Sequence, residues 1–150
     1  MAKTKFVYVI YISSTQEKIW KALLDGEMTK QYWGHENFSD WKPGSMWQHR
    51  KFDDAHTVMI AGEVVEFSPP KRLVMTWAFA EEVKDKSKHS RVAIDLEPLG
   101  DMVRLTVVHD ELEPESNMLH GISEGWPRVL SSLKSFLETG KPLNTWVGKK

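Results

Sequence analysis

The middle of the chain is a series of strand-like segments joined mostly by short turns, and this series restricts the possible folds most strongly. Alternating apolar and polar residues, rich in β-branched and aromatic types, occupy Met46–Phe52, Val58–Phe67, Arg72–Phe79, Arg91–Glu97 and Met102–Glu111. Turn-forming sequences separate them, such as KPG at residues 42–44 and GD at residues 100–101. Short connections favour antiparallel pairing of successive strands. We therefore expect an antiparallel sheet containing about six strands from this part of the chain.

The N-terminal third has a different pattern. An apolar run over Phe6–Ile12 is rich in β-branched and aromatic residues and predicts a first strand. It is far too short to span a membrane. Ser14 and Glu17 have the spacing of a capping box, and Gly26 is the expected end of the helix that follows. A second short helix is predicted around residues 27–33, ending at Gly34.

The C-terminal part predicts one long helix with an unusual beginning. An apolar face recurs at three- and four-residue spacing through Val129, Leu130, Leu133, Phe136 and Leu137, and Gly140 follows as a stop signal.

Upstream of this face, Gly121, Gly125 and Pro127 weaken or break helices. Two geometries fit: a helix that starts near Ser123, or a longer helix from about Ser116 that is kinked between Gly121 and Pro127. We favour the kinked helix, because the apolar spacing continues backwards through Trp126. In this hypothesis the bend turns Trp126 inward as a lid and gates ligand entry.

Composition limits the functional classes. We expect one domain over residues 1–150, with a core at about residues 6–140 and a tail at 141–150. The net charge of −1 provides no basic excess that would indicate nucleic-acid or membrane binding. The chain has no cysteine, which excludes disulfides and fits a cytoplasmic location. Seven tryptophans fit a large cavity, a partner surface or a bulky core.

Several stretches resemble the START-like (SRPBCC) superfamily, and more closely its branch named for the activator of the heat-shock protein 90 ATPase. The matching stretches are EKIWKALLD, KQYWG, WKPGSMWQHR, GEVVEFSPPKRLVMTW, RLTVVHDEL and GWPRVLSSLKSFLETG. The resemblance implies an α+β helix-grip fold: a curved antiparallel β-sheet grips a long C-terminal helix, with two short helices after the first strand. It leaves the function open, because the superfamily includes lipid carriers, hormone receptors, cyclases and chaperone activators.

Period-two alternation places several aromatic side chains and two histidines on the concave face of such a sheet. A pocket there would bind a small apolar or aromatic ligand through an aromatic wall and a few polar groups. The candidate pocket residues are Trp33, Trp47, His49, Met75, Trp77, Phe79, Val107, His109, Ile122 and Trp126. Burial alone also explains the indole rings, so filling of the core is the competing interpretation.

Other functions stay open as alternatives. The chain contains no nucleophile or cofactor-binding signature, so we predict no catalytic residue and no cofactor, although a cyclase- or hydrolase-like enzyme remains an alternative. No metal site is predicted, because the spacing of His49, His109 and Glu63 matches no ligand motif. A chaperone or another protein is an alternative partner, which an exposed aromatic patch around Trp33, Trp41 and Trp146 would favour. The charged stretch Glu81–His89 is interpreted as a solvated loop or a mobile flap.

Overall fold

A computed structural model describes residues 2–51 and 55–143 of the chain. The elements, in chain order, are β1 (Thr4–Ile12), α1 (Gln16–Leu24), α2 (Gly26–Trp33), β2 (Glu36–Ser39), β3 (Met46–Arg50), β4 (Val58–Ser68), β5 (Arg72–Phe79), β6 (Ser90–Leu99), β7 (Met102–Leu112) and α3 (Asn117–Thr139). Two 3-10 turns are present near the stretch Glu81–His89: Ala80–Glu82 begins one residue before it, and Lys86–Lys88 lies within it.

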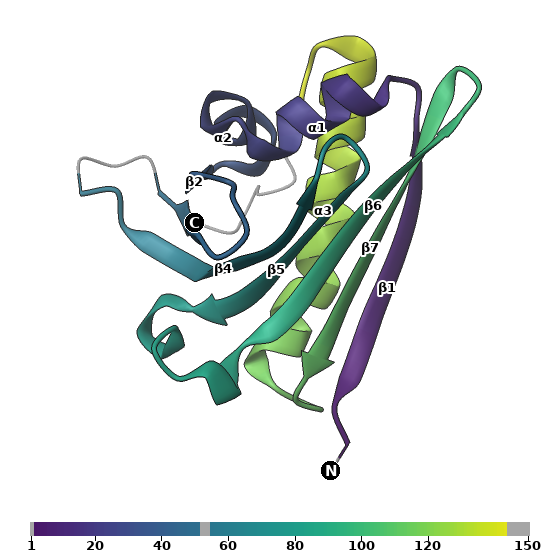
Figure 1. The fold of residues 1–150 in the computed structure, drawn as a ribbon. Helices are drawn as coiled ribbons and strands as arrows, with labels where there is room; N and C mark the ends of the chain where they lie inside the picture. Colours follow the sequence, from purple (N-terminus) through teal and green to yellow (C-terminus); the bar gives the residue numbers. More distant parts are fainter. Residues whose placement is uncertain (1, 52–54, 144–150) are drawn as a thin grey trace.

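The strands form one seven-stranded sheet in the order β1-β7-β6-β5-β4-β3-β2. Every neighbouring pair is antiparallel. The sheet is curved, α3 crosses one of its faces, and α1 and α2 lie together at one end (Figure 1). The predicted helix-grip architecture is therefore confirmed, because short turns force antiparallel pairing and the sheet's apolar face requires a cover.

Local details of the N-terminal region differ from the sequence prediction. The N-cap of α1 is Thr15, whose hydroxyl oxygen accepts a hydrogen bond from the amide of Lys18 at 3.2 Å. The predicted cap at Ser14 is therefore one residue too early. Gly26 does not close α1; it begins α2, because the Asp25 side chain caps the second helix. Strand β2 was not predicted, since four residues give too short a pattern.

Helix α3 begins where the longer of the two predicted helices begins. The Ser116 hydroxyl oxygen accepts a hydrogen bond from the amide of Leu119 at 3.1 Å, and the helix runs without interruption through Pro127 to Thr139. Gly140 ends it in the left-handed region with φ of 83°. The start near Ser116 is thus confirmed, whereas the kink and the gating role of Trp126 stay predictions.

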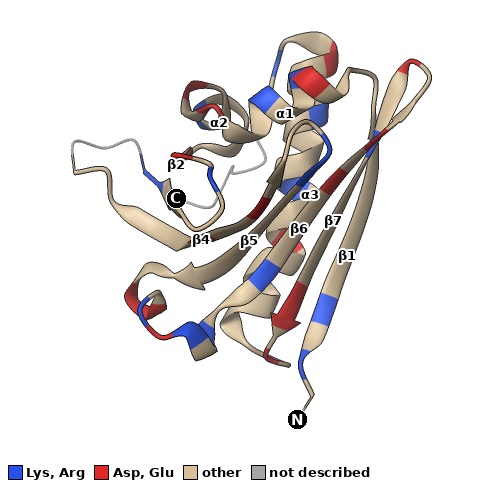
Figure 2. Cartoon of the chain, in the orientation of Figure 1, with Lys and Arg blue, Asp and Glu red and all other residues tan. Residues whose placement is uncertain are grey.

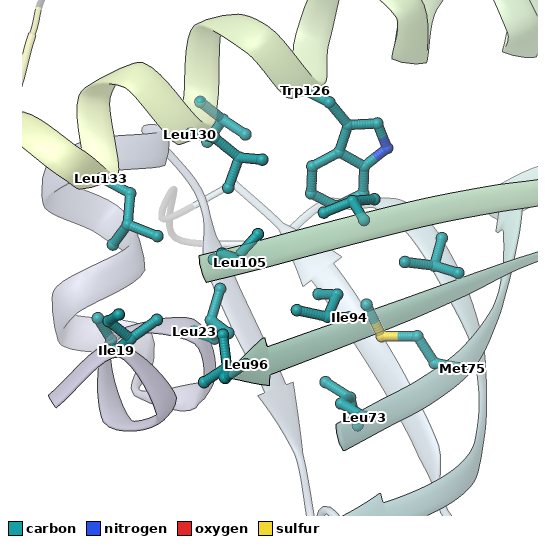
Figure 3. Packing of buried hydrophobic residues seen from close by; sticks show 14 of the residues in the cluster. Ile19, Leu23, Leu73, Met75, Ile94, Leu96, Leu105, Trp126, Leu130 and Leu133 are labelled. Atoms are coloured by element: carbon teal, nitrogen blue, oxygen red, sulfur yellow. The ribbon is translucent and has the colours of Figure 1, made fainter. Parts of the chain in front are cut away.

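The core lies between α3 and the concave face of the sheet. Figure 3 shows Leu130 and Leu133 of α3 facing Leu105 of β7 and Leu96 of β6. Helix α1 adds side chains at one end of this core, whereas Trp126 enters it nearer the other end (Figure 3). Because every second residue of β7 from Val103 to His109 is buried, the period-two prediction holds for this strand.

Charged residues of both signs are distributed over most elements of the fold (Figure 2). Lys and Arg are intermixed with Asp and Glu on α1, α2 and the turns after β5 (Figure 2). Within the described residues, no helix combines the length and apolar character that a membrane span requires.

Candidate functional site

A cavity of about 470 Å³ lies between the sheet and the first half of α3. Its volume is within the range of about 300–1,000 Å³ that is typical of small-molecule sites. The wall is formed by Trp33, Gly34, His35, His49, Ile60, Trp77, Phe79, Asn117, Met118, Gly121, Ile122, Gly125 and Trp126.

The wall contains three indole rings and two imidazole rings. The Trp126 ring centroid lies 5.6 Å from that of Trp33 and 5.4 Å from that of Trp77. The His49 ring lies 4.7 Å from both Trp33 and His35. These separations are those of favourable aromatic pairs, so the rings hold one another in place around the cavity.

Sequence periodicity explains how these groups converge. Trp77 and Phe79 are two residues apart in β5 and therefore share the concave face. On α3, Gly125 lies four residues after Gly121 and three after Ile122, so all three line the cavity from neighbouring positions on the helix surface. The concave face of the sheet and this surface of α3 together enclose the cavity.

Trp126 is held in the wall by a directed hydrogen-bond chain. Its indole N–H donates to Nδ1 of His109 at 3.1 Å, which leaves the ring hydrogen of His109 on Nε2. That nitrogen lies 2.7 Å from Oγ of Ser90, and the Ser90 hydroxyl donates to the carbonyl of Trp77 at 3.0 Å. All three side chains are buried, so the chain fixes the orientation of Trp126 against β5 and β7.

His49 is oriented by a second chain. Asn37 and His49 face each other in the β2–β3 pair. The Asn37 amide group donates to the carbonyl of Leu23 at 3.2 Å, so its oxygen points to Nδ1 of His49, 2.7 Å away. Nδ1 therefore has the ring hydrogen, and Nε2 keeps its lone pair as an acceptor.

Burial keeps the two central imidazoles neutral. It lowers the pKa of His49 to about 3, and the neighbouring His35 acts in the same direction. Burial also lowers the pKa of His109 to about 3. The pKa of His35 is lowered by burial and by the charge of Lys51, although the carbonyl of Trp33 opposes the shift. At neutral pH these rings act as hydrogen-bonding groups rather than as cations.

The structure divides the predicted pocket residues into two sets. The residues that line the cavity are Trp33, His49, Trp77, Phe79, Ile122 and Trp126. Those that do not line it are Trp47, Met75, Val107 and His109, all fully or almost fully buried in the core.

A second layer of packing explains this division. The Trp47 ring lies 5.1 Å from that of Trp77, and its N–H donates to the carbonyl of Thr76 at 2.8 Å. Period-two alternation identifies the concave face but does not say which side chains another ring covers. A ligand-binding role for either set stays a prediction.

Some wall residues have no clear signal in the sequence. Ile60, Asn117 and Met118 belong to patterns that also fit ordinary packing. His35 follows the left-handed cap Gly34, which turns the chain back toward the sheet. The position of His35 directly after a helix-ending glycine was the one sequence signal that could have indicated its place in the wall.

The metal site and the exposed aromatic patch that the sequence analysis considered can be compared with the structure. Among the described residues, no group of three or more His, Asp or Glu side chains is placed to hold a metal ion. Trp33 and Trp41 are partly buried and packed against the core, and Trp146 lies outside the described residues.

A curved antiparallel sheet that encloses a long C-terminal helix defines the helix-grip fold of START-like proteins. Residues 13–138 match the family model described as "Activator of Hsp90 ATPase homolog 1-like protein". The chain therefore belongs to this family. No curated protein sequence matches the chain significantly.

Solved structures share the fold across nearly the whole chain. The Aha1 dimer from Colwellia psychrerythraea has a TM-score of 0.75 at 21% identity, covering 92% of this chain and 98% of that one. Protein MLL2253 from Mesorhizobium loti has a TM-score of 0.74 at 24% identity, covering 90% and 97%. CalU16 from Micromonospora echinospora has a TM-score of 0.73 at 19% identity, covering 92% and 78%. At these identities the likeness establishes the fold alone.

Proposed function

We propose that this domain binds a small apolar or aromatic ligand in the cavity between α3 and the sheet. The observation that supports the proposal is the pair Gly121 and Gly125 in the cavity wall. A Cβ atom built at either position meets no heavy atom within 4 Å, so neither glycine is needed for close packing. Each costs the helix about 0.8 kcal/mol or more relative to alanine. Both line the cavity, Gly121 as an exposed residue and Gly125 as a half-buried one, so no side chain from these two positions occupies the space beside the aromatic wall.

A cavity-filling variant tests the proposal. In Gly121→Leu/Gly125→Leu, two leucine side chains extend into the open space while the helix gains better helix formers. We expect the affinity for Nile red, an uncharged apolar dye, to fall at least about tenfold, since the lost apolar contact area is worth more than 1.4 kcal/mol. Dye fluorescence measures the affinity, and thermal unfolding shows that the variant is folded.

The matched control places the same side chain on the outer surface of the same helix. His120 is exposed and does not line the cavity, so His120→Leu is expected to leave dye affinity unchanged. A folded double variant that binds the dye as tightly as the unmodified protein would contradict the proposed site.

Stimulation of a chaperone ATPase, the activity in the family description, is a separate candidate. Its support is the family name. The aromatic surface that would favour it is not formed by Trp33 and Trp41, because both pack against the core. The cavity is the more specific feature of the described residues, and for this reason ligand binding is the function proposed.

A further inference from the structure

The hydrogen-bonding groups of the cavity narrow the class of ligand. Resting on the proposed function, we infer that the ligand is an uncharged ring compound with a hydroxyl group, and that this hydroxyl donates a hydrogen bond to Nε2 of His49. Two properties of the wall support this inference: a fixed acceptor, and the absence of charged lining groups in the described residues.

The fixed acceptor is His49. Its Nδ1 is occupied by the Asn37 oxygen at 2.7 Å, and the Asn37 amide is itself oriented by the Leu23 carbonyl. In the other tautomer, with the ring hydrogen on Nε2, the lone pair of Nδ1 would face the Asn37 oxygen, and both atoms would be acceptors. Asn37 is thus a positioning residue, and the wall presents a lone pair at Nε2. A ligand group that donates a hydrogen completes this nitrogen's bonding, whereas a group that only accepts does not.

The charge of the wall excludes ionised ligands. No Lys, Arg, Asp or Glu is present among the described residues that line the cavity. A carboxylate or an ammonium group would therefore lose its hydration on entering the cavity and find no opposite charge there. Desolvating an unpaired charge in this way is strongly unfavourable. An uncharged hydroxyl avoids this cost and still provides a donor.

Two lining residues, His35 and Trp77, each have a buried ring nitrogen, Nδ1 and Nε1 respectively, without a hydrogen-bond partner among the described residues. The Trp77 and His49 ring centroids are 6.4 Å apart. The Trp77 N–H is itself buried, so the ligand hydroxyl is assigned to Nε2 of His49 alone.

A series of naphthalene derivatives tests the inference because the ring is constant and only the substituent changes. Calorimetry or fluorescence would compare naphthalene, 2-naphthol, 2-methoxynaphthalene and 2-naphthoate. We expect 2-naphthol to bind about three- to tenfold more tightly than naphthalene or 2-methoxynaphthalene, because a neutral hydrogen bond has a modest net value. The naphthoate anion is expected to bind at least about tenfold more weakly than 2-naphthol.

The outcomes separate the inference from the proposed function. If none of the four compounds binds, the proposed function fails. If naphthalene binds and the affinity of the methoxy compound equals or exceeds that of 2-naphthol, the cavity is a ligand site, but the inferred hydrogen bond from the ligand to His49 is wrong. Tightest binding by 2-naphthoate would likewise overturn the uncharged class.

A variant and a spectroscopic signal locate the hydrogen bond. In His49→Phe the preference for 2-naphthol over naphthalene should disappear, whereas the exposed His120→Phe should retain it. The nitrogen-15 signal of Nε2 of His49 in the unmodified protein provides a test that does not require the variant to fold. This signal should shift with 2-naphthol and stay in place with naphthalene; equal shifts with both compounds would contradict the inference.

Discussion

Lowering the pH from about 7.5 to about 5 is expected to reduce the free energy of unfolding by at least about 4 kcal/mol, with about 2 kcal/mol from each of His49 and His109. His35, whose pKa is also lowered by burial, adds to this loss. The imidazoles of His49 and His109 have a folded-state pKa of about 3, against an ordinary value of 6.5. Below pH 6.5 the unfolded chain binds protons that the folded protein excludes. The stabilising contribution is therefore complete above pH 6.5 and is lost progressively as the pH falls toward 3.

Urea unfolding followed by circular dichroism at several pH values above 5 measures this loss. The range avoids carboxylates such as Glu36, whose pKa lies below its ordinary value of 4.5; burial raises it, but hydrogen bonds from His56 and Arg50 outweigh this effect. In His109→Gln the loss should shrink by about 2 kcal/mol, because glutamine does not titrate. The exposed His120→Asn should behave like the unmodified protein, and a pH-independent stability would disprove the buried neutral state of both rings.

Gly62→Ala is expected to destabilise the protein by about 3 kcal/mol, near the upper end for overpacking. A Cβ atom at this position would overlap the Thr76 carbonyl group, lying 2.5 Å from its carbon. Thr76 has little freedom to move. Its carbonyl accepts the Trp47 indole at 2.8 Å, and its hydroxyl accepts the Glu63 amide at 2.8 Å.

The matched control is the same substitution where space is open. Gly121→Ala adds a methyl group that meets no atom within 4 Å, in a helix where alanine is favoured by about 0.8 kcal/mol or more. Denaturant midpoints should therefore move in opposite directions for the two variants. A Gly62→Ala protein as stable as the unmodified one would show that β4 and β5 do not approach each other this closely.

The fold could be predicted from the sequence because its determinants are local and periodic. Alternation defined β5 and β7, and the apolar spacing continued backwards from Val129 indicated that α3 begins near Ser116. Strand β2 could not be recognised, because its four residues are stabilised by pairing with β3 rather than by a pattern of their own.

The candidate site could be predicted only in part. Alternation placed Trp77 and His109 on the concave face, yet it could not distinguish a ring at the cavity from one in the layer behind it. His109 is turned away from the cavity wall by its bonds to Trp126 and Ser90, which come from distant parts of the chain. The acceptor role of His49 similarly depends on Asn37, a residue of the unpredicted strand. Such tertiary hydrogen bonds have no sequence period.

The central claim is that ligands bind in the cavity between α3 and the sheet, and the indole N–H signals in a nitrogen–proton correlation spectrum test it most directly. Trp33, Trp77 and Trp126 line the cavity, whereas the buried Trp20 packs against Phe67 with ring centroids 5.5 Å apart and does not line it. Adding saturating 2-naphthol should shift the signals of the three cavity tryptophans and leave that of Trp20 in place. Saturable binding that moves none of the three would contradict the account.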